Sequence, residues 1–461
     1  MRINHREASR PVLRETSRQA LPVVIGAVLV VAAFVLPRMN LGVNPRRDAG
    51  LERFAARAGA APIFGYWDIH AGWGTAPAIL IAVAAVVWGS ALARRLSWRV
   101  LTLGTWATTC GWAFALAMID GWQRGFAGRL TTKDEYLSQV PSITDIPAAL
   151  RSFSSRILDF QPNSWTTHVS GHPPGALLTF VWLDRIGLHG GAWAGLLCLL
   201  VGSSAAAAVV IAVRALTDEQ TARRAAPFVA VAPTAIWVAV SADGYFAGVA
   251  AWGIALLAVA VRRPVRFPAL VAAAAGLLLG WGVFLSYGLM LMGLPALAVL
   301  LSAADWRAVL RALGPAVLAA VAVAVVFAVA GFYWLDGYTL VQQRYWQGIA
   351  KDRPFQYWSW ANLACAVCAM GLGSVAGISG VFDWAAIRRR CGFHLLLLAI
   401  LAAIVCADLS KLSKAETERI WLPFTIWLTA APALLPVPSR VWLALNAAGA
   451  LLLNTIIFTN W

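Results

Sequence analysis

The chain has 461 residues, of which 60% are hydrophobic and only 13% charged, and its mean hydropathy is +0.71. A soluble multidomain protein of this composition would expose large apolar surfaces, so the composition predicts a polytopic membrane protein. The net charge of +16 does not indicate a nucleic-acid-binding protein, because the arginines fall in short segments between apolar runs, where lipid headgroups account for them.

The chain begins with a basic segment, residues 1–19, followed by an apolar run without a convincing cleavage site, which predicts a cytoplasmic arm and an uncleaved first span. An all-α fold of about thirteen transmembrane helices follows from the apolar runs, allowing for tilt. They lie near residues 21–36, 76–93, 100–119, 191–213, 225–241, 245–261, 268–286, 288–303, 313–335, 358–383, 393–408, 420–436 and 440–458.

The arginine-bearing loops support this register. With the N-terminus inside, all of them fall in the cytoplasm, as the positive-inside rule requires, and the C-terminus lies outside. The loops contain Arg94, Arg95 and Arg99; Arg214, Arg223 and Arg224; Arg262, Arg263 and Arg266; Arg307 and Arg311; and Arg388, Arg389 and Arg390.

Residues 173–188 are apolar but short. Counting them as a span would move every later arginine loop outside, so we predict a juxtamembrane or re-entrant helix within the outer loop 120–190. The other long outer segments are 37–75 and 334–357. Carboxylates, histidines and aromatic residues are interleaved in these segments, so any function visible in the sequence lies outside.

The first candidate site is the acidic pair Asp134 and Glu135 in "TTKDEYLSQVP". Adjacent carboxylates point in different directions, so one can act as a general base while its neighbour positions a group. The alternative is a solvated acidic turn.

The second candidate is "WTTHVSGHPPGALLTF", residues 165–180. Pro173 and Pro174 predict the start of a helix, while Gly171 and Gly175 allow close approach of backbone or ligand. His172 would then be held at the membrane surface, where it could bind a lipid phosphate or transfer a proton; the alternative is a helix-start turn facing water.

The third group comprises Asp243 in "SADGYF" and the cations of "KLSKAETERIWLPF". Lys411, Lys414 and Arg419 stand on the outer side, against the positive-inside trend, which suggests an anionic ligand. Snorkelling to outer-leaflet headgroups is the alternative.

Together these residues resemble the GT-C superfamily of polyprenyl-phosphate-sugar-dependent glycosyltransferases. An acidic pair in the first large outer loop, then "GHPPGALL" introducing a juxtamembrane helix, is similar to protein O-mannosyltransferases and lipid A aminoarabinose transferases. "SADGYF" and "ERIWLP" are similar to later elements of those enzymes, in the same order. The resemblance covers residues 100–461, the core with outer loop 120–190. It departs from the family in the two additional spans within residues 20–99 and in the lack of a large soluble C-terminal domain, which leaves the acceptor open.

The resemblance implies a mechanism. Asp134 or Glu135 would be the general base for an acceptor hydroxyl that displaces the lipid phosphate with inversion. The leaving phosphate would be bound by His172, Lys411, Lys414 and Arg419. Tyr345 could stack on a sugar, or belong to an interfacial aromatic belt. The remaining supporting residues are His168, Gly171, Pro173, Pro174 and Asp243.

No cofactor is required by this chemistry, although a divalent metal held by Asp134 and another carboxylate is compatible with it. The six cysteines indicate neither a disulfide framework nor a zinc site, because Cys365 and Cys368 lack partners at zinc spacing. The implied partners are a polyprenyl-phosphate-linked sugar, a cell-envelope acceptor and membrane lipids, at the plasma membrane.

The richness in alanine, arginine and tryptophan is typical of actinobacteria, where such enzymes transfer mannose or a pentose. Two other functions stay open: a transporter or flippase of lipid-linked saccharide, and a membrane scaffold without the chemistry. A transporter would carry charged residues within its spans, and the helices here are nearly free of them apart from His394.

Overall fold

A computed structural model describes residues 5–39, 41–46, 59–436 and 440–460. Within this part of the chain, eight helical segments are long and apolar enough to cross a membrane. The first is Gln19–Arg38, the later part of α1 (His5–Val35) with the turn that follows it. The others are α3 to α4 (Thr75–Ala84 and Ser90–Arg95, joined by the π-helical turn Ala85–Gly89), α5 (Trp98–Ala117), α9 (Gly191–Leu216), α12 (Ala242–Arg262), α13 (Pro268–Leu285), α15 (Trp306–Val329) and α20 (Gly392–Leu409). Most of the predicted basic arm lies outside the residues whose side chains are described.

The other predicted spans are shorter or bent. α17 (Phe355–Met370) and α18 (Leu372–Val381) form a pair bent by 105° at Gly371, which has φ 82°. A positive φ interrupts helical geometry and suits glycine. Three shorter apolar helical segments are η8 with α14 (Tyr287–Met292, Gly293–Leu301), α22 with η10 (Leu422–Leu428, Ala431–Leu434), and α23 (Arg440–Ile456). Among the described residues the count is therefore eight, or nine with the bent pair, and the count of thirteen stays a prediction.

The predicted single span 225–241 is wrong in one respect. It forms two short helices, α10 (Glu219–Ala230) and α11 (Ala235–Val238), separated by a turn that contains Pro233. Proline has no N–H to donate within a helix. Where a helix is broken among other helices, its free backbone N–H and C=O groups need hydrogen-bond partners from elsewhere. Trp112 of α5 supplies one, since its indole Nε1 donates to the Ala232 carbonyl at 3.1 Å.

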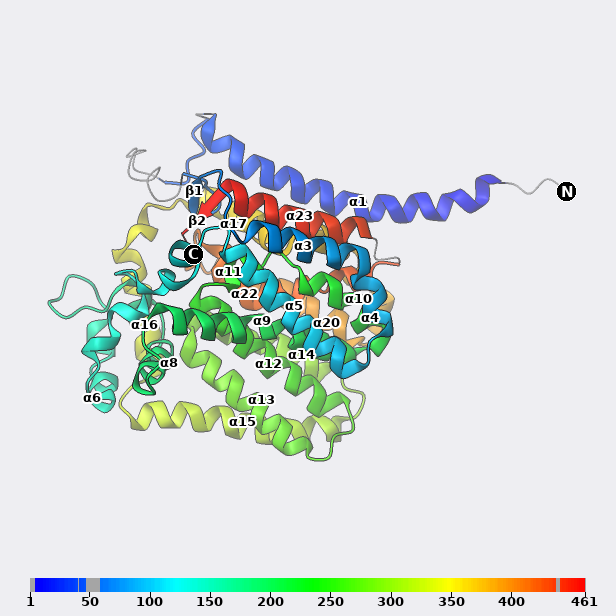
Figure 1. Cartoon of the computed structure of the whole chain (residues 1–461). Coiled ribbons are helices and arrows are strands. Elements are labelled where there is room, and N and C mark those ends of the chain that lie inside the picture. Colours follow the sequence, from blue (N-terminus) through cyan, green and yellow to red (C-terminus); the bar gives the residue numbers. More distant parts are fainter. Residues whose placement is uncertain (1–4, 40, 47–58, 437–439, 461) are drawn as a thin grey trace.

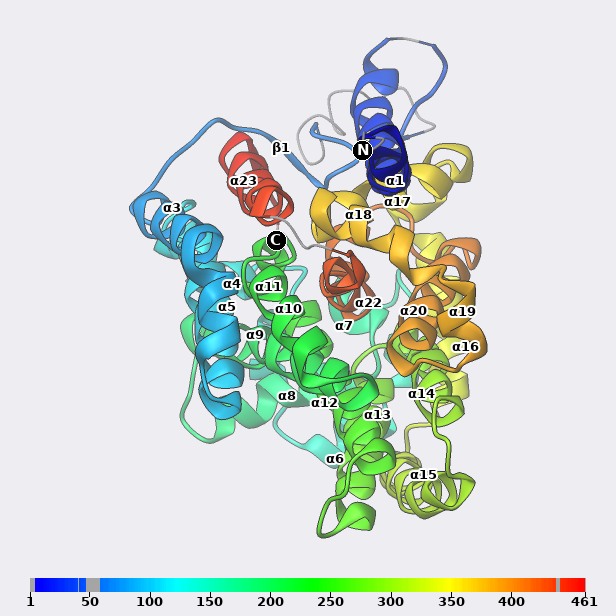
Figure 2. The same cartoon turned by 90° about the vertical axis from the view of Figure 1, so that its right-hand side faces the viewer.

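The long helices run side by side, so the bundle has two ends (Figure 1; Figure 2 gives the perpendicular view). At the arginine-rich end, Arg262 donates to the Ser302 carbonyl and Arg223 to the Ala93 and Leu96 carbonyls. This end gathers the close of α9 and α12 and the start of α10, α15 and α20. The opposite end, which we call the loop end, contains the start of α9 and α12 together with residues 118–190 and 330–355.

Short elements fill the loop end. They are β1 (Gly65–Trp67), η3 (Gln123–Ala127), η4 (Arg129–Thr131), η5 (Tyr136–Ser138), η6 (Val140–Ser142), α6 (Ile146–Arg151), η7 (Ser154–Arg156), α7 (Thr167–Gly171), α8 (Pro174–Arg185), α16 (Trp334–Gln347), η9 (Ile349–Asp352), α21 (Thr417–Ile420) and β2 (Ile457–Thr459). η1 (Leu36–Arg38) follows α1, and α19 (Trp384–Arg388) lies at the arginine-rich end. β1 and β2 pair antiparallel, a small sheet that the all-α prediction lacked.

The helix predicted within residues 173–188 is confirmed as non-spanning. α8 has 12 residues, about 18 Å at the helical rise, well short of a hydrocarbon core of about 30 Å. Pro174 occupies its first turn, as predicted. Gly175 permits the packing of α8 on α13, because a Cβ there would stand 2.5 Å from the Phe284 carbonyl oxygen; at Gly171 a Cβ would meet no atom of the described chain within 4 Å.

α13 and α15 contact each other through Gly276 and Gly280, which stand four residues apart on one face of α13. A Cβ at Gly276 would lie 2.0 Å from the Ala316 carbonyl oxygen, and one at Gly280 would lie 2.8 Å from the Ala320 Cα. Such small-residue pairs let helix backbones approach closely in a membrane, where van der Waals packing drives association.

Gly276→Ala should therefore push α13 and α15 apart and lower the thermal unfolding temperature in detergent, at a cost of about 1–3 kcal/mol from overpacking. Gly314→Ala in α15 is the matched control, because a Cβ there meets nothing within 4 Å. Equal stability of the Gly276→Ala variant and the wild type would contradict this helix contact.

Candidate active site

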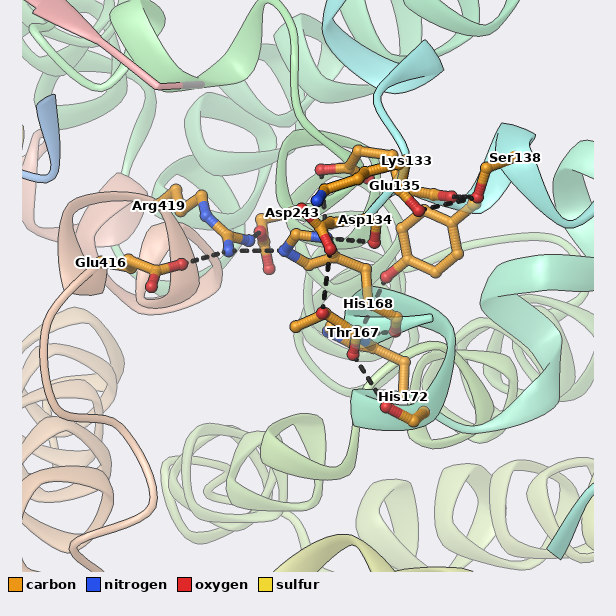
Figure 3. A network of polar contacts seen from close by, with 12 residues as sticks. Lys133, Asp134, Glu135, Ser138, Thr167, His168, His172, Asp243, Glu416 and Arg419 are labelled. Carbon is orange, nitrogen blue, oxygen red and sulfur yellow. Dashed lines mark hydrogen bonds and ion pairs between the residues drawn. The ribbon is translucent and has the colours of Figure 1, made fainter. Parts of the chain in front are cut away.

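A buried guanidinium group stands at the centre of the loop end. Arg419 of α21 donates through Nη1 to Asp243 Oδ2 at 2.5 Å and through Nη2 to Glu416 Oε2 at 2.6 Å. Its Nη2 also lies 3.1 Å from His168 Nε2. Figure 3 shows Arg419 between these side chains, and the four residues come from three separate parts of the sequence.

Asp243 is positioned by the start of α12. Ser241 is the N-cap: its hydroxyl accepts from Gly244 N at 3.1 Å and donates to the Trp237 carbonyl. The cap places Asp243 in the first turn, where the helix dipole favours a carboxylate. The short motif "SADG" therefore both starts the helix and delivers a buried charge to Arg419.

His168 of α7 links Arg419 to the acidic pair. Its Nδ1 lies 2.8 Å from the Asp134 carbonyl oxygen, which can only accept, and 3.4 Å from Glu135 Oε1. These contacts fit the tautomer that carries hydrogen on Nδ1, so that Nε2 accepts from Arg419. Four motifs that are far apart in the sequence thus meet in one chain of contacts.

The two acidic residues have different surroundings. Glu135 is buried, with 3% of its surface exposed. Burial raises the pKa of Glu135, and the nearby His168 and Arg419 oppose this rise. Asp134 is half-buried and accepts a hydrogen bond from the Thr167 hydroxyl at 3.3 Å. Of the two carboxylates, Asp134 is the more accessible to a ligand.

His172 lies beyond His168, on the side away from Arg419 (Figure 3). Its Nδ1 is 2.9 Å from both the Tyr136 hydroxyl and the His168 carbonyl, and its ring packs against Phe246. Burial lowers the pKa of His172 to about 4. The imidazole is therefore neutral at physiological pH and does not bring the positive charge that the sequence analysis expected for binding a phosphate.

The two predicted lysines are placed differently. Lys414 is buried, and its ammonium donates to the carbonyls of Ala350 and Arg353 at 2.7 and 2.8 Å. Lys411 is exposed, with its ammonium 5.2 Å from the centre of the Phe355 ring. Tyr345 accepts from the Lys414 backbone N–H at 3.1 Å. Lys414 and Tyr345 thus hold the loop that leads to Arg419, while Lys411 faces outward.

Three charged residues of this region were missed from the sequence. Arg353 donates to Glu416 Oε1 at 2.9 Å, so Glu416 bridges two guanidinium groups. Although burial alone would raise it, Arg353 and Arg419 lower the pKa of Glu416 to about 2. Glu418 is also buried, and its Oε1 accepts from Phe64 N at 2.8 Å. The adjacency of Glu416 and Glu418 to Arg419 was the available signal.

A second buried ion cluster joins the segment after α5 to β2 at the loop end. Asp120 contacts His70 Nε2 at 2.5 Å and Arg129 Nη2 at 3.0 Å, and Arg129 Nη1 donates to the Thr459 carbonyl at 2.8 Å. Burial raises the pKa of Asp120, and Arg129 and His70 oppose this rise. Because the cluster ties β2 to the segment after α5, its contacts account for a structural role.

Within the described residues, no group of three or more His, Cys, Asp or Glu side chains is arranged to hold a metal ion. In the Arg419 cluster, the Asp243 and Glu416 carboxylates are turned toward guanidinium groups. A divalent metal held by Asp134 and another carboxylate stays a prediction.

The fold has solved counterparts. The crystal structure of Archaeoglobus fulgidus oligosaccharyltransferase in complex with Zn and sulfate has a TM-score of 0.50 and 12% identity, covering 76% of this chain and 53% of that chain. ArnT from Cupriavidus metallidurans bound to undecaprenyl phosphate has a TM-score of 0.43 and 16% identity, covering 73% of this chain and 60% of that chain. The chain spans about half the length of the oligosaccharyltransferase.

No protein-family model and no curated protein matches the sequence. At 12% identity, the likeness to the oligosaccharyltransferase is one of fold. The chain therefore shares the membrane fold of this oligosaccharyltransferase, in agreement with the fold that the resemblance of its four motifs implied. The specific type of enzyme and the actinobacterial origin stay predictions.

The burial of Glu418 predicts that the stability of the folded chain depends on pH. Burial raises the pKa of Glu418 from 4.5 to about 7. Between these values the folded chain holds a proton that the unfolded chain has lost, so the free energy of unfolding falls as pH rises through this interval. Glu418→Gln cannot ionise and should remove this fall, a difference on the order of 3 kcal/mol at pH 8.

The measurement is the thermal unfolding temperature in detergent from pH 5 to pH 8. Relative to the variant, the wild type should lose stability as pH rises. Glu219→Gln serves as the control, because Glu219 is partly exposed and pairs with Arg214 and Arg223 at the other end of the molecule. Parallel pH profiles for the wild type and Glu418→Gln would contradict the assignment.

Proposed function

We propose that this chain is a membrane glycosyltransferase that moves a sugar, mannose or a pentose, from a polyprenyl-phosphate donor to a cell-envelope lipid, glycan or protein. The observation that carries this proposal is the contact chain Glu135–His168–Arg419–Asp243, which unites the four motifs at the loop end. The GT-C fold supports it. A buried network of this kind holds catalytic groups in place before the substrate binds, so they need no rearrangement during the reaction.

Asp134 is the residue that we assign as the general base. Its half-buried carboxylate can take the proton of an acceptor hydroxyl, whereas the Glu135 carboxylate is turned toward His168. The acceptor oxygen forms a bond to the anomeric carbon as the bond from that carbon to the phosphate oxygen breaks. The phosphate leaves with the electron pair, and attack from the opposite face inverts the anomeric carbon.

The neighbouring groups position the reactants. The charge of Arg419 is matched by Asp243 and Glu416, so its role is to hold His168 and the acidic pair in place. We assign the phosphate of the donor to Lys411, whose ammonium is exposed in the loop that carries Arg419. The open space beside Gly171, three residues after His168 in α7, is room for a ligand.

The central test is Asp134→Asn. Loss of the base should lower kcat by about 100-fold or more, measured with a radiolabelled polyprenyl-phosphate mannose or pentose donor and a cell-envelope acceptor fraction. Thermal stability should be unchanged, because the side chain is half-buried and accepts one long hydrogen bond. Glu135→Gln keeps a hydrogen-bonding oxygen beside His168 and should retain more activity than Asp134→Asn.

Asp184→Asn is the matched control in the same predicted outer loop, since Asp184 pairs with the exposed His189 at 2.7 Å. Wild-type kcat in Asp134→Asn would remove this residue as the base. Loss of transfer in Glu135→Gln with full transfer in Asp134→Asn would exchange the two roles. Wild-type transfer in both variants would contradict acid–base catalysis by this pair.

The proposed orientation puts the loop end on the extracytoplasmic face. A cysteine introduced at exposed Lys133 should react with a membrane-impermeant maleimide in intact cells, whereas one at exposed Arg307 should react only after the membrane is permeabilised. The native chain with its six cysteines gives the background signal. The reverse labelling pattern would place the candidate site in the cytoplasm and contradict the proposal.

A further inference from the structure

A cavity of about 660 Å³ lies at the arginine-rich end, opposite the candidate active site. The two places stand at the two ends of α12, with Asp243 in its first turn and Arg262 in its last turn. α12 has 21 residues, so about 30 Å of helix separates them. Residues from the close of α9, the start of α10, the segment after α14, α19 to α20 and η10 complete the wall.

The wall of this cavity carries more positive than negative charge. Its charged side chains are Arg224, Arg262, Arg389, Arg390, Asp218 and Asp383. Both aspartates already accept backbone N–H groups as helix caps: Asp218 accepts from Thr221 N at 2.7 Å, and Asp383 from Ala385 N at 2.9 Å. The aspartates thus serve helix ends, while Arg389 and Arg390 are exposed at the rim.

Polar groups in the same wall point to a ligand. His394 Nδ1 and Arg224 Nε are buried and have no hydrogen-bond partner within the described part of the chain. His394 lies in the first turn of α20, which has no side-chain cap at Cys391. The backbone N–H groups of an uncapped first turn attract anions, and here they open beside the arginines. A buried polar atom without a partner is costly unless something binds it.

Exposed aromatic side chains beside the cavity indicate that it lies at the depth of lipid headgroups. Phe382 and Trp384, on either side of the lining residue Asp383, are 51% and 69% exposed, and Trp306 at the start of α15 is 65% exposed. Aromatic residues exposed at helix ends are typical of the membrane interface. The headgroup of a lipid at this level would reach the rim arginines, while the acyl chains of the lipid stay beside the apolar surface of the helices.

We propose that this cavity binds the phosphate group of an anionic phospholipid in the leaflet at the arginine-rich end. Arg389 and Arg390 hold the phosphate at the rim. Arg224 donates to it through Nε, because its Nη2 already donates to the Leu435 and Pro436 carbonyls, and His394 and the first turn of α20 donate from within. Basic pockets between transmembrane helices bind anionic headgroups in this way. The site is separate from sugar transfer and does not depend on the proposed function.

The test measures lipid binding to the purified full chain in detergent. Native mass spectrometry titrates dioleoyl phosphatidylglycerol, with dioleoyl phosphatidylcholine as the neutral comparison. The double variant Arg389→Gln/Arg390→Gln should bind phosphatidylglycerol at least about tenfold more weakly than the wild type, because each arginine near an anionic headgroup contributes about 1 kcal/mol. Both side chains are exposed, so folding should be unaffected.

The matched control is Arg266→Gln/Arg307→Gln, which removes the same charge from exposed positions at the same end but outside the cavity wall. It should bind phosphatidylglycerol like the wild type. Equal weakening in both double variants, or no weakening in Arg389→Gln/Arg390→Gln, would overturn the site.

A second arm separates the sources of phosphate. Millimolar inorganic phosphate is added to the same titration, and its own binding is measured by calorimetry. A lipid site keeps its phosphatidylglycerol when inorganic phosphate is present. Displacement of the lipid, with calorimetric binding of inorganic phosphate that Arg389→Gln/Arg390→Gln abolishes, would assign the cavity to a soluble phosphate compound and overturn the lipid assignment.

Discussion

The loop end is organised around the burial of one positive charge. A guanidinium group inside a membrane protein is costly unless paired and fully hydrogen-bonded, so the position of Arg419 obliges Asp243, Glu416 and His168 to come to it. Each partner belongs to a different element: the first turn of α12, the loop before α21, and α7. The arrangement of the loops at the loop end of the bundle therefore follows from satisfying this charge, and the acidic pair is positioned as a consequence, through His168.

The candidate site and the cavity at the other end treat charge in opposite ways, although Glu219 at the arginine-rich end pairs with Arg214 and Arg223. At the loop end, cations and carboxylates are matched inside the protein, as in Arg353 with Glu416 and Arg129 with Asp120. At the arginine-rich end, the aspartates of the cavity cap helices and the rim arginines stand exposed. A matched interior suits a site in which groups must be held still, and an unmatched surface suits contact with anionic headgroups. Neighbouring glutamates show how local the matching is: Glu416, between two guanidinium groups, has a pKa lowered to about 2, whereas burial raises that of Glu418 to about 7.

Much of the fold could be predicted because it depends on local pattern. Apolar runs gave the long helices, arginine loops gave a consistent register, and the pair Pro173 and Pro174 marked the start of the non-spanning helix α8. The breaks within the predicted spans could not be predicted in this way, because hydropathy does not report where a helix is interrupted. Pro233 and Gly371 lie at such breaks, and the neighbouring helices supply partners for the interrupted backbone, as Trp112 does for Ala232. The sheet formed by β1 and β2 joins residues 65–67 to 457–459, a pairing with no local signal.

For the candidate site, the sequence by itself determined which chemical groups are present, their order, and their shared side of the bundle, since these follow from motifs and from charge asymmetry along the chain. Only the tertiary structure decided which groups meet. It brought His168, rather than His172, to Arg419, directed Lys414 to backbone carbonyls, and recruited Glu416. The reason is physical: spacing along a chain sets what one element can present, whereas the partner of a buried charge depends on the packing of elements hundreds of residues apart, such as α7 and α21.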